Sequence, residues 1–291
     1  MKVIKFFAIT AMAAAMITSC SNEDELSQSN YPSDNIIRVT AGVNNAKTRA
    51  EGAGTEMKND FSLTIVNKNA PKYTYTDKVF SKTSGDWACS ETLLWQKSDA
   101  LVDIVAFAPA QEGKFSAVYA DGSFKPVAYS VASDQSTDQS TSSANNDLLY
   151  YYAKDFNPGE SLDKGKLNIQ FNHAFCMIDI NVTLGTEFNK PDIPTTSPIT
   201  EVTLEGTKIE ANVNVTNAAN IVTASETATA AKIITTKGTF DKAANAETNA
   251  KSHFSCIVIP QNVAANTFKV SLKTAGKLYE WTSDKEITLQ S

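Results

Sequence analysis

The sequence predicts an all-β protein with a β-sandwich architecture, and three observations support this prediction. Apolar and polar residues alternate along many short segments, which is the pattern of strands half buried against a core. Turn-forming residues separate these segments, and helical periodicity is scarce. The chain has 291 residues, of which 42% are hydrophobic and 20% charged, so it can form one or two domains with ordinary cores.

Residues 1–19 have the pattern of a bacterial lipoprotein signal peptide. Lys2 and Lys5 supply positive charge before an apolar run over residues 6–17, which is too short to cross a ~30 Å hydrocarbon core as a helix. Small residues then lead to Cys20, whose amine and thiol would be acylated after cleavage. Several acyl chains anchor a protein almost permanently. The alternative is an ordinary secreted protein with a chance cysteine near its cleavage site.

Residues 20–35 are polar and are expected to form an acidic, flexible tether. The stretch over residues 21–25 resembles the short acidic tag that routes lipoproteins of the Bacteroidetes to the outer face of the outer membrane. The alternative is a solvated linker that happens to be acidic. We therefore expect a surface-exposed lipoprotein of the outer membrane. The net charge of −6 and the lack of a basic run argue against a nucleic-acid partner.

The first alternating segment after the tether covers residues 36–43. Its apolar face carries Ile37, Val39, Ala41 and Val43. The same alternation recurs over residues 61–66, 167–171, 176–182, 202–204, 213–215 and 268–272.

Two runs, residues 101–107 and 254–259, are apolar on both faces and are expected to be central strands. Pro109 and Pro260 close them, because proline cannot donate to a strand ladder. The Ala-rich stretch over residues 217–232 fits a short helix or a loop.

Two further segments shape the expected domain organisation. Residues 133–146 contain a doubled Asp-Gln-Ser-Thr and almost no apolar residue, so we expect a long exposed loop. Residues 188–198 contain three prolines, and proline at that density marks a domain boundary. We therefore expect an N-terminal β-sandwich domain over residues 36–187 and a C-terminal one over residues 188–291.

A series of short segments carries a family resemblance through its order along the chain. The segments are Ile37-Arg38-Val39, Lys47-Thr48-Arg49-Ala50, Trp95, residues 102–109, residues 147–150, residues 171–178 and Ile259-Pro260-Gln261. In this order they resemble the fimbrillin family of the Bacteroidetes, which includes Mfa-like pilus subunits. The resemblance implies two tandem transthyretin-like β-sandwich domains after the lipoprotein signal, and a place in a fimbrium (pilus) that serves adhesion.

The resemblance also implies a mode of assembly with other pilus subunits, called donor-strand exchange. In this scheme a trypsin-like protease cuts after an arginine near the N-terminus, the first strand leaves, and a strand from a neighbouring subunit takes its place. Here the cleavage candidate is Arg49, followed by Ala50, and the displaceable strand is the one that carries Ile37, Val39, Ala41 and Val43. Small polar residues and glycines over residues 44–54 favour an open loop that a protease can reach. The alternative is that Arg49 is an exposed loop residue that is never cut.

Catalytic and metal sites find little support in the sequence. The chain has two histidines, His173 and His253, and both adjoin apolar strand patterns, so we expect structural roles for them. No G-x-S-x-G, H-E-x-x-H or C-x-x-C motif and no calcium loop occurs. We expect no enzyme activity, no cofactor and no metal. Asp103 and Asp179 lie inside strand patterns and are expected to face solvent or bond a neighbouring backbone.

Cysteines and aromatic residues complete the set of candidates. Three cysteines remain after Cys20, so at most one disulfide can form within the chain, and buried thiols are expected. The aromatic residues support an alternative function, a monomeric surface lipoprotein that binds a host or glycan ligand through flat aromatic rings. The rings in question belong to Trp87, Trp95, Trp281 and the run Tyr150-Tyr151-Tyr152. The apolar neighbours of Trp95 and Trp281 favour core packing instead.

Overall fold

The computed structural model describes residues 30–44, 57–110, 116–137 and 147–290, and strands dominate this part of the chain. The all-β prediction is therefore confirmed. The helical elements here are three short turns: η2 (Pro71–Tyr73), α1 (Pro158–Ser161) and η3 (Thr186–Asn189). No helix in the described ranges has the length and apolar content needed to cross a bilayer.

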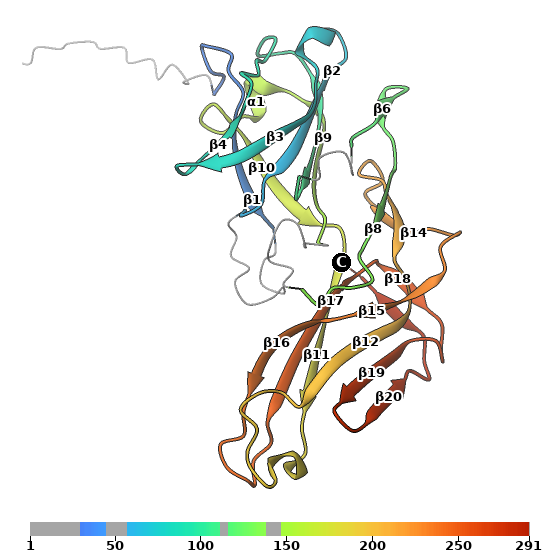
Figure 1. Cartoon of the computed structure of the whole chain (residues 1–291). Helices are drawn as coiled ribbons and strands as arrows, with labels where there is room; N and C mark the ends of the chain where they lie inside the picture. Colours follow the sequence, from blue (N-terminus) through green and yellow to red (C-terminus); the bar gives the residue numbers. More distant parts are fainter. Residues whose placement is uncertain (1–29, 45–56, 111–115, 138–146, 291) are drawn as a thin grey trace, which may run out of the picture.

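A seven-stranded sheet forms the upper body in Figure 1, in the order β1-β10-β9-β5-β2-β3-β4. The strands are β1 (Arg38–Val43), β10 (Lys166–His173), β9 (Leu149–Phe156), β5 (Val102–Ala108), β2 (Phe61–Asn67), β3 (Tyr75–Thr83) and β4 (Asp86–Cys89). Within it, β5 lies at the centre and is buried along its whole length, which confirms the central strand expected before Pro109. The sheet curls, so that its outer strands β1 and β4 approach each other.

Two further sheets pack face to face in the lower body (Figure 1). One has the order β11-β17-β16, with β11 (Cys176–Thr183), β17 (Lys251–Val258) and β16 (Thr236–Asp241). The other has the order β15-β12-β19-β20, with β15 (Ala230–Ile234), β12 (Ile199–Lys208), β19 (Lys269–Thr274) and β20 (Leu278–Thr282). The strand β17 is central and ends before Pro260, which confirms the second expected central run.

Small sheets connect and close the two bodies. They are β14-β13-β8, β18-β21 and β6-β7. Their strands are β6 (Tyr119–Ala120), β7 (Ser123–Phe124), β8 (Val127–Ser130), β13 (Glu210–Val213), β14 (Val222–Ala224), β18 (Gln261–Val263) and β21 (Ile287–Leu289). Because β8 pairs with β13, the first half of the chain contributes a strand beside the second half. One buried cluster draws on both halves, including Val105, Phe107, Phe175 and Ile257.

Strand pairing bears on the expected domain division, which stays a prediction. The strand β11 lies in the expected first domain but pairs along its whole length with β17 of the expected second domain. Two other expectations differ from the structure. Gln135, in the expected exposed loop, is fully buried, while residues 138–146 of that loop lie outside the described ranges. The Ala-rich stretch, expected to be a short helix or a loop, contains β14 and the start of β15.

Candidate functional site

The first strand, β1, is an outer strand of the seven-stranded sheet and is the structural feature around which the candidate site is built. It pairs in parallel with β10, in the register Val39 to Leu167 and Val43 to Phe171. The other strand pairs of this sheet are antiparallel, so β1 is the exception.

The two faces of β1 differ as the alternation predicts. Ile37, which directly precedes the strand, is 6% exposed and Val39 is 4% exposed, and both belong to the core cluster of this sheet. Ala41 and Val43 are partly buried and pack against the same cluster. The four residues expected to form the apolar face therefore share it.

Polar side chains join β1 to β10 on the solvent face. The hydroxyl of Thr40 donates to the Asn168 side chain at 3.3 Å, and the Asn44 amide donates to the Asn172 side chain at 3.2 Å. These contacts are exposed, and water competes for them, so they add little to the stability of the pairing. The sheet therefore holds β1 through its ladder and through its three inward apolar side chains, Val39, Ala41 and Val43.

The other edge of β1 is only partly occupied. Just before the strand, the Ile37 backbone N–H donates to the Leu93 carbonyl at 2.9 Å, and the Trp95 N–H donates to the Asn35 carbonyl at 2.8 Å. These bonds bring residues 35–37 beside residues 93–95 and close the curled sheet. Along Arg38–Val43 the described strands include no second ladder partner.

The strand β10, which lies beside β1 in the sheet, carries apolar side chains whose flanks β1 shields from water. Leu167, Ile169 and Phe171 of β10 are each 0% exposed. Removal of a neighbouring strand would expose their flanks and leave backbone groups of β10 unpaired, and both changes are unfavourable in water. A strand with apolar residues at alternate positions would restore both the burial and the ladder. In this structure β1 provides both the cover for these side chains and the pairing for this edge of β10.

Arg38 and Asp34 flank the start of β1 with an exposed ion pair. The Arg38 guanidinium donates to both carboxylate oxygens of Asp34, at 3.0 and 2.6 Å. This hydrogen bonding, followed by that of the Ile36 backbone N–H, lowers the pKa of Asp34 to about 2. Both side chains are about half exposed, so the pair orients the entry of the strand without contributing much stability.

The remaining predicted site residues lie outside the described ranges. These are Cys20, the lipidation candidate, and Arg49 with Ala50, the cleavage candidate. Acylation and cleavage at these positions therefore stay predictions.

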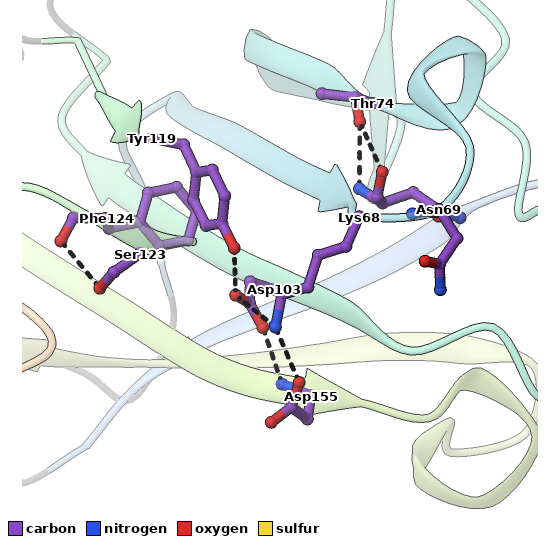
Figure 2. Close-up of polar contacts among 9 residues, drawn as sticks. Lys68, Asn69, Thr74, Asp103, Tyr119, Ser123, Phe124 and Asp155 are labelled. Atoms are coloured by element: carbon purple, nitrogen blue, oxygen red, sulfur yellow. Dashed lines mark hydrogen bonds and ion pairs between the residues drawn. The ribbon is translucent and has the colours of Figure 1, made fainter. Parts of the chain in front are cut away.

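The sequence analysis missed a buried charged cluster (Figure 2). The cluster lies on the face of the seven-stranded sheet opposite to the core cluster that contains Val39. Asp103, on the central strand β5, is 2% exposed. Its carboxylate lies 3.0 Å from the Lys68 Nζ and accepts hydrogen bonds from the Tyr119 hydroxyl and the Asp155 backbone N–H, both at 2.9 Å. The backbone bond fits one of the two roles expected for Asp103. The signal that could have revealed the ion pair was a carboxylate in the middle of a run apolar on both faces.

Local turns place the partners of Asp103. Lys68 follows β2 in a turn held by Asn67, whose side-chain oxygen accepts the backbone N–H groups of Asn69 and Ala70 at 3.0 and 2.9 Å. Asp155 has φ 49° at a register shift between β5 and β9, which turns its N–H towards Asp103. Because Tyr119 belongs to the β6–β7 hairpin, the cluster fixes that hairpin onto the sheet (Figure 2). Its role is structural.

The histidines pair with single carboxylates. His173 Nδ1 lies 2.7 Å from Asp147, and His253 Nε2 lies 3.2 Å from Asp241. Within the described ranges, no group of three or more His, Cys, Asp and Glu side chains could hold a metal ion.

Cys176 and Cys256 are both buried, as expected for these thiols. Burial raises the pKa of Cys256 to about 12.

The aromatic residues of the alternative glycan platform do not form one surface. Trp95 is 2% exposed and stacks on Phe156, and Trp87 packs against Phe61 with ring centroids 4.9 Å apart. The run Tyr150-Tyr151-Tyr152 is partly buried, with alternate rings on two clusters. Trp281 differs, because 54% of it is exposed on the outer strand β20.

Comparison with protein families adds an independent observation. A family model described as fimbrillin-like matches residues 48–291. The chain belongs to the fimbrillin-like family. Among curated protein sequences, none matches this chain significantly.

Several solved structures of bacterial surface proteins are similar to this chain. A candidate cell adhesion protein from Bacteroides uniformis superimposes with a TM-score of 0.52 at 16% identity, covering 88% of this chain and 90% of that one. A fimbrial protein from Bacteroides vulgatus gives 0.48 at 16% identity, with 87% and 89% covered. The fimbrial anchor protein Mfa2 from Porphyromonas gingivalis gives 0.39 at 9% identity, with 85% and 82% covered. Family membership supports a fimbrial or adhesin-like role at the cell surface.

Proposed function

We propose that this fimbrillin-like chain is a lipoprotein subunit of a surface fimbria, either structural or anchoring, that assembles with other subunits by strand exchange and serves adhesion. The observation that carries the proposal is the position of β1. It is an outer strand with a single complete ladder, and it covers the fully buried side chains of β10. In this proposal the protein is attached to the outer membrane through acylated Cys20, and it has no catalytic role.

If β1 leaves the sheet, the vacated position beside β10 defines what a donor strand must offer. It needs an extended backbone that pairs with β10 and apolar side chains at alternate positions, spaced like Ile37, Val39 and Ala41. Because β1 pairs in parallel, a donor that pairs antiparallel would form the slightly more stable ladder. Exchange would then be favourable once the covalent link between β1 and β2 is cut.

Cleavage after Arg49 is the step that would release β1, and it can be tested directly. We propose N-terminal sequencing of the surface-exposed protein from cells that express the full chain. The expected sequence starts at Ala50, and the protein should form ladders of oligomers that resist mild denaturant. A blocked N-terminus at an acylated Cys20 on all surface protein would contradict exchange through β1, and would leave a permanently anchored protein.

Matched variants distinguish loss of cleavage after Arg49 from a general effect of removing a basic residue in this segment. Arg49→Gln is expected to retain the N-terminal segment and abolish the oligomer ladder, because a trypsin-like protease requires a basic residue before the cut. Lys47→Gln changes a neighbouring basic residue and should leave both readouts unchanged if the cut follows Arg49. Equal ladders from both variants would contradict the assignment of Arg49.

The alternative function, a monomeric surface protein that binds glycans, has less support. Of the aromatic residues that could form a platform, Trp95 is buried and Trp87 packs on Phe61. An unprocessed monomer that binds soluble oligosaccharides would favour this alternative over strand exchange.

A further inference from the structure

The two facing sheets of the lower body have unequal numbers of strands, and the difference falls on one side. The sheet β11-β17-β16 has three strands, and the sheet β15-β12-β19-β20 has four. The chain passes from β15 to β16 through the single residue Thr235, so these two strands occupy the same side of the sandwich. The strands β11 and β20 therefore lie at the other side.

Packing shows which strands face each other. The central strands β12 and β17 are in contact across the interface. Ile180 and Val182 of β11 pack against the same buried cluster as Val270 and Leu272 of β19. Since β11 faces β19, no strand among the described residues lies opposite β20, which is outermost in Figure 1.

The side chains at this position are those of an uncovered core. Trp281 and Tyr279 pair in register with Val270 and Leu272, so all four share the inner face of their sheet. Tyr279 is nevertheless 43% exposed and Trp281 54% exposed. In the facing sheet, the inward side chains Ile178, Ile180 and Val182 of β11 are also only half-buried. Apolar residues on an inner face are normally covered, so an exposed set here marks a binding surface.

We propose that an extended segment of another protein chain adds to the free edge of β11, lies opposite β20, and covers Tyr279 and Trp281. Along residues 177–183 the backbone of β11 pairs with β17 on one side, and no described strand pairs with its other edge, which is therefore open to an added strand. The unfilled position opposite β20 is one strand wide, because the two facing sheets have three and four strands. A second copy joined edge to edge through β11 does not fit, because β20 of each copy would occupy the place of β19 of the other.

Charge defines the chemistry of this segment further. Asp179 is exposed on the outer face of β11 and has no ion pair with a described basic residue. Opposite charges at directly paired positions stabilise neighbouring strands. The segment therefore carries apolar side chains at alternate positions and a lysine or arginine on its outer face, next to Asp179. The site at β11 is separate from the position of β1 beside β10, and the proposal for it does not depend on displacement of β1.

The test uses the purified full chain and a capped synthetic peptide, Thr-Val-Lys-Val-Thr-Ile-Thr-Val, with a second peptide in which glutamate replaces lysine. Hydrogen exchange measured by NMR is expected to show new protection over residues 176–183, together with a blue shift of Trp281 fluorescence. Trp281→Ser is expected to weaken binding about tenfold, because it removes most of the newly covered aromatic surface. Protection along β10 without protection of β11 would overturn the proposal.

A charge exchange makes the test specific. Asp179→Lys should weaken binding of the lysine peptide and strengthen binding of the glutamate peptide, each by about two- to fivefold. Since this residue is exposed, the variant is expected to fold normally. An unchanged preference between the peptides would overturn the assigned register. Quenching of Trp281 by a soluble oligosaccharide, with no response to either peptide, would also overturn the proposal in favour of a glycan platform.

Discussion

The Nζ atom of Lys68 lies 3.0 Å from the carboxylate of Asp103, whose side chain is 2% exposed while that of Lys68 is 33% exposed. A buried carboxylate is tolerated only where charge and hydrogen bonds compensate for lost hydration. Here Tyr119 and the Asp155 backbone complete the compensation. The pKa of Lys68 is raised, first by its hydrogen bond to Asp155 and then by Asp103, so the ammonium stays charged throughout the neutral range.

Asp103→Asn tests this compensation. The variant keeps the shape of the side chain but removes its charge, so Lys68 loses one of its two carboxylates. We expect the free energy of unfolding to fall by about 1–3 kcal/mol, measured by urea denaturation. Asp99→Asn is the matched control, because Asp99 forms an exposed pair with Lys97. Equal denaturation midpoints for the two variants would contradict a stabilising role for Asp103.

Asp34 gives a prediction for pH dependence. Its pKa of about 2 lies below the value of about 3.9 expected for an unfolded chain, mainly because Arg38 donates hydrogen bonds to it. A lowered folded pKa means that its contribution to stability is present above about pH 4, and is lost as the pH falls through 2. An NMR titration of the Asp34 carboxyl carbon should show this midpoint, and Arg38→Gln should raise it. The control Thr40→Ala, on the same face of β1, should leave the midpoint unchanged.

The strands themselves could be predicted from sequence because their signal is local. The alternation of Val39, Ala41 and Val43 determines which face of β1 is buried, whichever strand pairs with it. The partner of β1 could not be predicted in this way. Its parallel pairing with β10 joins residues 128 positions apart, as in the contact between Thr40 and Asn168. No local periodicity encodes such a distance.

The polar cluster and the strand crossing at Thr235 were missed for the same reason. Lys68, Asp103 and Asp155 come from three separate segments, and each alone has the pattern of an ordinary surface or strand residue. The stretch before Thr235 is rich in threonine, which favours strands, and in alanine, which is depleted in them, so its local preferences conflict. Long-range pairing with β12 makes it a strand.

Gly206 occupies an irregular position in β12, where the pairing with β15 shifts between Leu204 and Thr207. Its φ of 97° is one that only glycine adopts readily, and an added Cβ would collide with the backbone of Thr267. We expect Gly206→Ala to lower the free energy of unfolding by at least about 2 kcal/mol. Gly276→Ala is the control, because nothing lies near its Cβ position. Thermal unfolding that ranks the two variants equally would contradict this account.

The last prediction concerns Gln135, whose buried side chain forms hydrogen bonds with the backbone of Ile257 in β17. Its amide oxygen accepts the Ile257 N–H and its amide nitrogen donates to the Ile257 carbonyl, both at 2.8 Å. Gln135→Ala would leave both groups of Ile257 without these bonds in a buried place, so we expect a loss of about 2–4 kcal/mol in the free energy of unfolding. Hydrogen exchange should also accelerate at Ile257. The control Gln170→Ala removes an exposed hydrogen bond to Asn168 and should change neither quantity. Acceleration spread evenly over all strands, with none specific to β17, would show that Gln135 acts only through global stability.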